Sequence, residues 1–68
     1  MEQRIGETAG KVWRVLNENG EMTISQVPKA VKETEALTYL AMGWLAREGK
    51  LGFRASGKKT LVYLTDRG

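Results

Sequence analysis

The chain has 68 residues and a net charge of +3, and it contains no histidine and no cysteine. This composition excludes disulfide bridges and the usual zinc ligand sets, and it removes the common nucleophile–base pairs of enzymes. No apolar run reaches membrane-spanning length, and the N-terminal residues lack the apolar segment of a signal peptide. We therefore expect a single domain over residues 1–68, in the cytoplasm, without metal, cofactor or enzymatic activity.

The first predicted helix spans residues 4–18 and ends at Asn19-Gly20, because glycine readily adopts the left-handed conformation that closes a helix. Its apolar face consists of Ile5, Ala9, Val12 and Leu16 at helical spacing. Gly6, Gly10 and Trp13 lie on a flank beside that face. Each interior glycine costs roughly 1 kcal/mol relative to alanine. The pair therefore predicts the close approach of another backbone, with simple tolerance of the two glycines as the alternative.

A short second helix of about seven residues is predicted after the extended piece Met22-Thr23-Ile24. Ser25 is its expected N-cap, because a serine hydroxyl can accept a hydrogen bond from a free backbone N–H of the first turn. Pro28 falls in that turn, where its missing N–H is tolerated.

The third predicted helix covers about 35–48, with Thr34 as its N-cap candidate and Gly49 as its closing residue. Helical spacing predicts an inward face of Leu37, Leu40, Ala41, Trp44 and Leu45. The outward positions are then Glu35, Thr38, Tyr39, Met42, Gly43 and Ala46. A short helix, a tight turn and a longer helix are typical of a helix-turn-helix.

A hairpin is predicted after the third helix, with a turn at Ser56-Gly57-Lys58-Lys59. The expected fold is therefore α+β, with three helices, a short strand and a C-terminal hairpin. Strand alternation places Leu61 and Tyr63 on one face and Val62 and Leu64 on the other, so both faces need cover. A homodimer would cover this strand and the glycine flank together. The candidate interface residues are Gly6, Gly10, Trp13, Leu61 and Tyr63.

Three segments carry a family resemblance: Thr23-Ile24-Ser25-Gln26-Val27, Leu45-Ala46-Arg47-Glu48-Gly49-Lys50-Leu51 and Tyr63-Leu64-Thr65-Asp66-Arg67-Gly68. In these segments the chain resembles the winged helix-turn-helix superfamily. The last segment is similar to the closing pattern of regulators in the multiple-antibiotic-resistance and phenolic-acid-repressor families. Those regulators continue into a dimerising helix, whereas this chain stops at Gly68. It is therefore more similar to small stand-alone bacterial winged helix-turn-helix chains of uncharacterised function.

The resemblance implies a role in binding double-stranded DNA, with the third helix in the major groove and the hairpin, or wing, on phosphates. The candidate DNA-binding residues are Lys29, Lys32, Thr34, Thr38, Tyr39, Arg54, Lys58 and Lys59. Residues 47–67 hold six basic and two acidic side chains, against five and six before them. The expected outward face of the third helix has no Arg, Lys, Asn or Gln to read bases. We therefore expect a transcription-associated protein that binds duplex DNA mainly through backbone contacts from a basic wing.

A protein-interaction module that does not bind nucleic acid is the alternative function. The expected outward stripe of Tyr39, Met42 and Ala46 is more apolar than a surface that faces solvent or phosphate. Tyrosine and methionine are both enriched at protein interfaces. Packing of Tyr39 and Met42 under the wing or the first helix is the third possibility.

Overall fold

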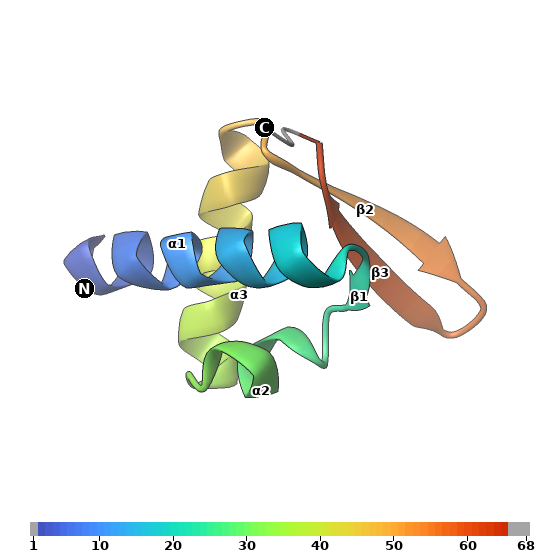
Figure 1. The fold of residues 1–68 in the computed structure, drawn as a ribbon, viewed down its shortest axis with the longest axis horizontal. Helices are drawn as coiled ribbons and strands as arrows, with labels where there is room; N and C mark the ends of the chain where they lie inside the picture. Colours follow the sequence, from blue (N-terminus) through green and yellow to red (C-terminus); the bar gives the residue numbers. More distant parts are fainter. Residues whose placement is uncertain (1, 66–68) are drawn as a thin grey trace.

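Three helices and a three-stranded antiparallel sheet make up the fold (Figure 1). The computed structural model describes residues 2–65. The elements in chain order are α1 (Glu2–Asn19), β1 (Met22–Thr23), α2 (Val27–Val31), α3 (Glu35–Arg47), β2 (Leu51–Ser56) and β3 (Lys59–Leu64). This order confirms the predicted α+β architecture. The Asp66-Arg67-Gly68 end of the segment that resembles the regulators lies outside the described residues.

The ends of α1 and α3 follow the predicted capping chemistry. Gly20 has a φ of 77°, and its N–H donates to the Leu16 carbonyl at 2.8 Å, which closes α1. Gly49 has a φ of 73° immediately after α3. At the start of α3 the Thr34 hydroxyl oxygen accepts a hydrogen bond from the Leu37 N–H at 3.2 Å. Local sequence is sufficient for these boundaries because each depends on one residue and its immediate neighbours.

The start and the length of α2 differ from the prediction. The expected cap at Ser25 is wrong, because Gln26 occupies the N-cap position and makes no side-chain cap bond. The Gln26 side chain instead accepts a hydrogen bond from the Thr23 N–H at 3.2 Å. The helix has five residues rather than about seven, and it ends at Lys32, which has left-handed backbone angles of φ 59° and ψ 44°.

The sheet has the strand order β1-β3-β2. Val62 of β3 lies opposite Met22 of β1 and Phe53 of β2, so these three side chains share one face. Val62 and Leu64 of β3 are buried on this face, and Leu51 of β2 joins them. The opposite face carries Gly52, Arg54, Leu61 and Tyr63.

The core lies where α1 crosses α3, between the sheet and α2 (Figure 1). Its fully buried apolar side chains come from α1, α2, α3 and β3, and they are Val12, Leu16, Val27, Ala41 and Val62. A short α2 is sufficient because Val27, Pro28 and Val31 are all buried.

The inward face of α3 is not the predicted one. Thr38 and Met42 are buried, whereas Leu40 and Trp44 leave 50% and 41% of their surface exposed. The prediction of a buried Trp44 is therefore wrong. Apolar residues occur almost all round α3, so helical spacing alone permits more than one inward face. The packing of α1 and the sheet selects the face that consists of Leu37, Thr38, Ala41, Met42 and Leu45.

Candidate nucleic-acid interface

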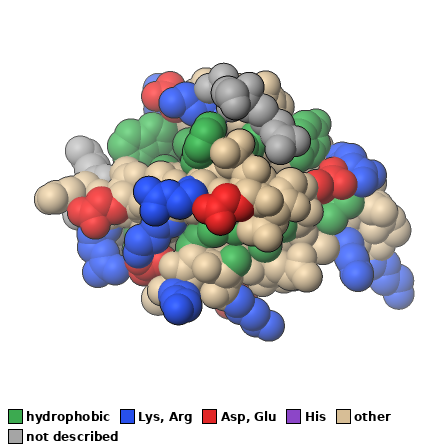
Figure 2. Space-filling view, in the orientation of Figure 1, with side chains coloured by type: hydrophobic (Ala, Val, Ile, Leu, Met, Phe, Trp, Pro, Cys, Tyr) green, Lys and Arg blue, Asp and Glu red, His purple; other side chains and the backbone are tan. Residues whose placement is uncertain are grey.

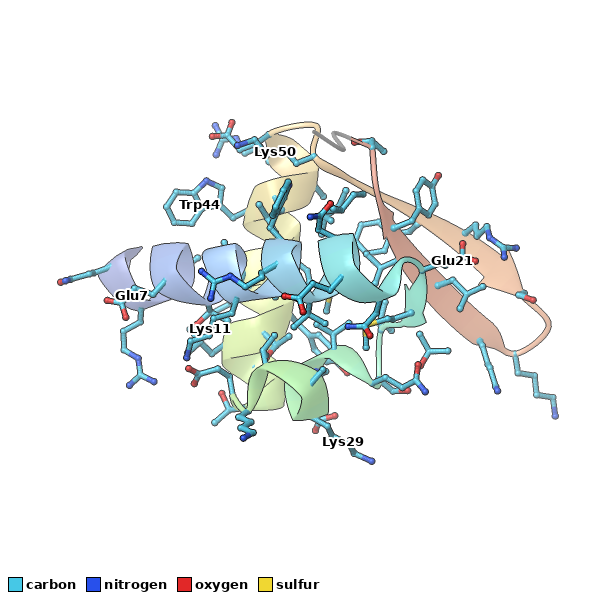
Figure 3. The ribbon with its side chains drawn as sticks, viewed as in Figure 1. Glu7, Lys11, Glu21, Lys29, Trp44 and Lys50 are labelled. Atoms are coloured by element: carbon cyan, nitrogen blue, oxygen red, sulfur yellow. The ribbon has the colours of Figure 1, made fainter. Side chains whose placement is uncertain are left out.

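Four exposed lysines lie on α2, directly after its last residue and at the tip of the hairpin. We call this set the basic edge; it consists of Lys29, Lys32, Lys58 and Lys59. Figure 2 shows basic side chains at the margin of the molecule near α2 and again at the hairpin tip, with uncharged surface between the two groups. In Figure 3, Lys29 projects from α2 away from the rest of the fold. The structure thus places four of the predicted DNA-binding residues, in two pairs from separate parts of the chain, at one margin of the molecule.

The hairpin turn projects two of these lysines. Ser56 pairs with Lys59, which leaves Gly57 and Lys58 as a two-residue loop. Gly57 has a φ of 64°, and no other residue of that loop has a positive φ. Glycine at the first of two loop positions is typical of a type II′ turn, which matches the twist of a hairpin.

The wing and the start of α2 are held at a defined separation. The Ile24 N–H, just before α2, donates to the Thr60 carbonyl of β3 at 2.9 Å. A groove of about 380 Å³ lies between the two parts, and its lining includes Ser25, Gln26, Lys58 and Lys59. The backbone of β3 beside the hairpin turn is therefore joined to the segment that leads into α2.

Carboxylates elsewhere on the surface are already paired with other cations. Glu33 accepts a hydrogen bond from Lys11 at 2.9 Å and one from Arg4 at 3.4 Å. The hydrogen bond from Lys11 is the main cause that lowers the pKa of Glu33 below its ordinary value. No lysine of the basic edge forms an ion pair within residues 2–65. The positive charge of this edge is therefore not neutralised by the described part of the chain.

Arg54, a predicted phosphate contact, has a carboxylate partner in its own chain. Its Nη2 and Nε atoms donate to Glu21 at 2.7 and 2.5 Å. This hydrogen bonding lowers the pKa of Glu21 and raises that of Arg54. A phosphate contact by Arg54 would require the loss of this ion pair. Glu21 was missed because it lies 33 residues from Arg54, and only strand pairing brings the two together.

The three predicted site residues at the start of α3 have different environments. Thr38 is fully buried, and its hydroxyl donates to the Thr34 carbonyl at 2.8 Å. The prediction of Thr38 as a DNA contact is therefore wrong, since its side chain belongs to the core. Thr34 is exposed and caps the helix, as described above. Tyr39 is 40% exposed, and its hydroxyl lies 3.5 Å from an oxygen of Glu35.

A connected apolar surface occupies the solvent side of α3. We call it the α3 outer face; it consists of Tyr39, Leu40, Gly43 and Trp44. The same residues line a groove of about 670 Å³ together with Ile5, Arg47 and Glu48. The tyrosine hydroxyl and the indole N–H of Trp44 are the side-chain hydrogen-bonding groups among the four. This surface therefore lacks the amide and guanidinium groups that discriminate between bases.

The glycine flank of α1 faces Trp44 of the same chain. Trp44 ring atoms lie 3.8 Å from the position that a Cβ would take at Gly6, whereas nothing lies within 4 Å of that position at Gly10. Trp13 is half-buried. A groove of about 590 Å³ separates Trp13 from Trp44, with Gly6 and Gly10 among its lining residues. In Figure 3, Trp44 lies in the angle between α1 and α3.

The second predicted interface, on the outer face of the hairpin, is partly covered within the chain. Tyr63 lies directly over Gly52, where an added Cβ would come within 2.5 Å of the ring. Tyr63 and Leu61 are both half-buried. This contact gives Gly52 and Tyr63 a structural role within a single copy.

Other kinds of site are not evident in the described part of the chain. No three His, Cys, Asp or Glu side chains in residues 2–65 are grouped so that they could hold a metal ion. No helix in this range combines the length and the apolar character needed to cross a membrane. The basic edge and the α3 outer face are thus the two surfaces that need a functional explanation.

Comparisons with known proteins agree with this architecture. A family model described as a winged helix-turn-helix domain (DUF2582) matches residues 1–64. An uncharacterised protein of Methanocaldococcus jannaschii is 39% identical over 64 residues, which is 90% of each chain. A Bacteroides thetaiotaomicron protein, solved by NMR in solution, superposes with a TM-score of 0.84 at 35% identity. The match covers 94% of the present chain and 79% of that protein.

Proposed function

The chain belongs to the winged helix-turn-helix family DUF2582, and on that premise we propose that it binds double-stranded DNA through its basic edge. The observation that carries this proposal is the set of four lysines on α2 and the wing that have no acidic partner among residues 2–65. The role is that of a small transcription-associated protein, and we place it in the cytoplasm as a homodimer.

The affinity should come from phosphate contacts. If three or four of the lysines neutralise phosphates, binding is micromolar or weaker at physiological salt and falls steeply as salt rises. Glu21 and Glu33 do not oppose this attraction strongly, because each already has a cationic partner. Thr34, at the exposed start of α3, is a further phosphate contact in this proposal.

Sequence discrimination should be weak. In the usual docking of this fold, the solvent side of the third helix reads base edges in the major groove. Here that side is the α3 outer face, whose aliphatic, aromatic and glycine positions make few base-specific hydrogen bonds. Tyr39 would therefore contribute little to duplex binding and no bidentate recognition of a base.

Charge removal at matched sites tests this function. Lys58→Ala/Lys59→Ala should weaken binding about equally for all duplex sequences and reduce the slope of log K against log salt by about two. The control is Arg14→Ala/Lys50→Ala, which removes the same charge from exposed residues outside the edge. Lys50 lies at the end of the molecule opposite α2 (Figure 3). The control should leave the salt slope unchanged.

Two results would contradict the proposal. One is an equal reduction of the salt slope in Lys58→Ala/Lys59→Ala and in Arg14→Ala/Lys50→Ala, because the position of the removed charge would then not matter for binding. The other is undetectable duplex binding at low salt by a folded protein.

A protein-interaction module is the second candidate, favoured by the exposure of Tyr39, Leu40 and Trp44. Its test is Tyr39→Ser/Leu40→Ser, which should abolish partner capture and leave any duplex binding nearly intact. The pair Tyr39 and Met42 does not serve this purpose, because Met42 belongs to the core and its replacement would destabilise the fold.

A further inference from the structure

We propose that the α3 outer face is the contact between two copies of this chain, which pack their α3 helices antiparallel across a twofold axis. The axis passes near the middle of the helix, between Ala41 and Met42. The inference uses none of the basic-edge lysines, so phosphate contacts through that edge remain available to a dimer. The α3 outer face itself would then be covered by the second copy and could not enter a major groove. It replaces the glycine flank of α1 and the outer face of the hairpin as the predicted interface.

The first argument is exposure. Tyr39, Leu40 and Trp44 leave 40%, 50% and 41% of their surface exposed, although all three are large and partly apolar. They follow one another along one side of α3 and border a groove of about 670 Å³. Connected exposed apolar surfaces of this kind mark interaction sites, and aromatic residues are enriched at them.

The second argument is the glycine within this surface. Gly43 lies in the interior of α3, where glycine is less favourable than alanine. Apart from its two chain neighbours and the backbone of its own helix, nothing in the described part of the chain lies within 4 Å of the position that a Cβ would take. Packing within one copy therefore does not require a glycine here. The close approach of a second helix does.

The third argument is the register that the sequence permits. Leu40 and Gly43 are equally distant from the midpoint between Ala41 and Met42, and so are Tyr39 and Trp44. An antiparallel second copy therefore places Leu40 near the partner's Gly43, close to the centre of the contact. Tyr39 lies on one flank of the contact and Trp44 on the other, and the arrangement is the same from both sides. A twofold interface requires this self-complementarity.

The fourth argument is charge. Glu35 lies in the first turn of α3 and Arg47 in the last. Antiparallel packing brings each end of the helix near the opposite end of its partner. Counted from the same midpoint, Glu35 is level with the partner's Glu48 and one residue from the partner's Arg47, so Arg47 is the cation within its reach. The two helix dipoles are then antiparallel, which is the favourable alignment for dipoles that lie side by side. A polyanion would instead meet Glu35 and Glu48 along this surface, which is why the proposed occupant is a second copy and not DNA.

The area of the α3 outer face limits the expected affinity of the dimer. A stable interface buries about 800 Å² on each partner. That is roughly one-sixth of the 4602 Å² surface of this chain. The α3 outer face reaches part of that area and is extended by Ile5, Arg47 and Glu48 at its margins. We therefore expect a dimer that dissociates in the micromolar range, as for a small interface.

Two leucine substitutions at open glycines form a matched test. Gly43→Leu introduces a side chain into the contact, whereas Gly10→Leu introduces the same side chain on α1. Both positions are exposed and have no atom within 4 Å of the added Cβ, so both variants should fold. Sedimentation equilibrium at tens of micromolar should give the wild-type chain and Gly10→Leu twice the 7.6 kDa mass of one chain. Gly43→Leu should weaken self-association by at least about tenfold and approach the mass of one chain.

Charge reversal tests the antiparallel arrangement. Glu35→Arg and Arg47→Glu should each weaken the dimer, and the double variant should recover it, because the pair is re-formed with opposite sign. Circular dichroism of every variant confirms that the fold is intact. A monomeric wild-type chain overturns the inference, and so does a dimer that survives Gly43→Leu. Equal weakening of the dimer by Gly43→Leu and Gly10→Leu also counts against the inference, and so does dissociation of the dimer by Gly10→Leu alone. A Glu35→Arg/Arg47→Glu double variant that does not recover the dimer counts against the antiparallel arrangement.

Discussion

Lys32 combines a strained backbone with a place in the basic edge, so Lys32→Gly separates stability from binding. Its left-handed angles, φ 59° and ψ 44°, cost a non-glycine residue about 1–2 kcal/mol. Glycine removes that cost but loses about 0.5–1 kcal/mol of extra chain entropy on folding. The net gain lies between about 0 and 1.5 kcal/mol, and its central value of about 0.75 kcal/mol corresponds to a rise in Tm of about 3–6 °C for a domain of this size.

Lys29→Gly is the matched control, because it removes the same charge from the middle of α2. Here glycine should destabilise the fold by about 0.5–1 kcal/mol and lower the Tm by a similar amount. Thermal unfolding followed by circular dichroism measures both shifts. Salt titrations of duplex binding should show that each variant loses about one unit of slope, despite their opposite effects on stability. A lower Tm for Lys32→Gly would refute the reasoning about its backbone.

Two further predictions concern the core and the ion pairs. Leu16→Ala should lower the free energy of unfolding in urea by about 2–5 kcal/mol, because Leu16 is 1% exposed. Trp44→Ala should lower it less, by about 1–2 kcal/mol, because Trp44 borders open grooves and its removal leaves no closed cavity. A larger loss for Trp44→Ala than for Leu16→Ala would contradict this account. The lowered pKa values of Glu21 and Glu33 mean that both carboxylates stabilise the fold above their ordinary pKa and lose that contribution as the pH falls through the lowered values. Unfolding measured from neutral to acid pH should therefore show a smaller decline for Glu21→Gln/Glu33→Gln than for the wild-type chain, and an equal decline would assign the acid sensitivity to other groups.

The element order and several boundaries could be predicted from the sequence because they depend on local chemistry. Gly20 and Gly49 close helices through backbone angles that other residues adopt at a cost. Thr34 caps α3 through a bond to a residue three positions away. The cap at α2 could not be chosen in this way, since Ser25 and Gln26 are adjacent polar residues, and Gln26 instead bonds back to Thr23.

The lysines of the basic edge could also be named from the sequence, whereas their common location could not. Lys29 and Lys32 precede Lys58 and Lys59 by more than twenty residues. The hydrogen bond between Ile24 and Thr60 joins the two regions. The pairing of Arg54 with Glu21 is likewise a consequence of strand register, because neither residue lies near the other in the chain.

The orientation of α3 was decided only by the tertiary structure. Apolar side chains occur on most sides of this helix, so burial of Leu40 with Trp44 and burial of Thr38 with Met42 satisfy the helical period similarly. The docking of α1 and the sheet buries the second pair, and Thr38 can be buried because its hydroxyl bonds to the Thr34 carbonyl. Local sequence thus determined that α3 forms, while contacts between distant elements determined that Leu40 and Trp44 face outward.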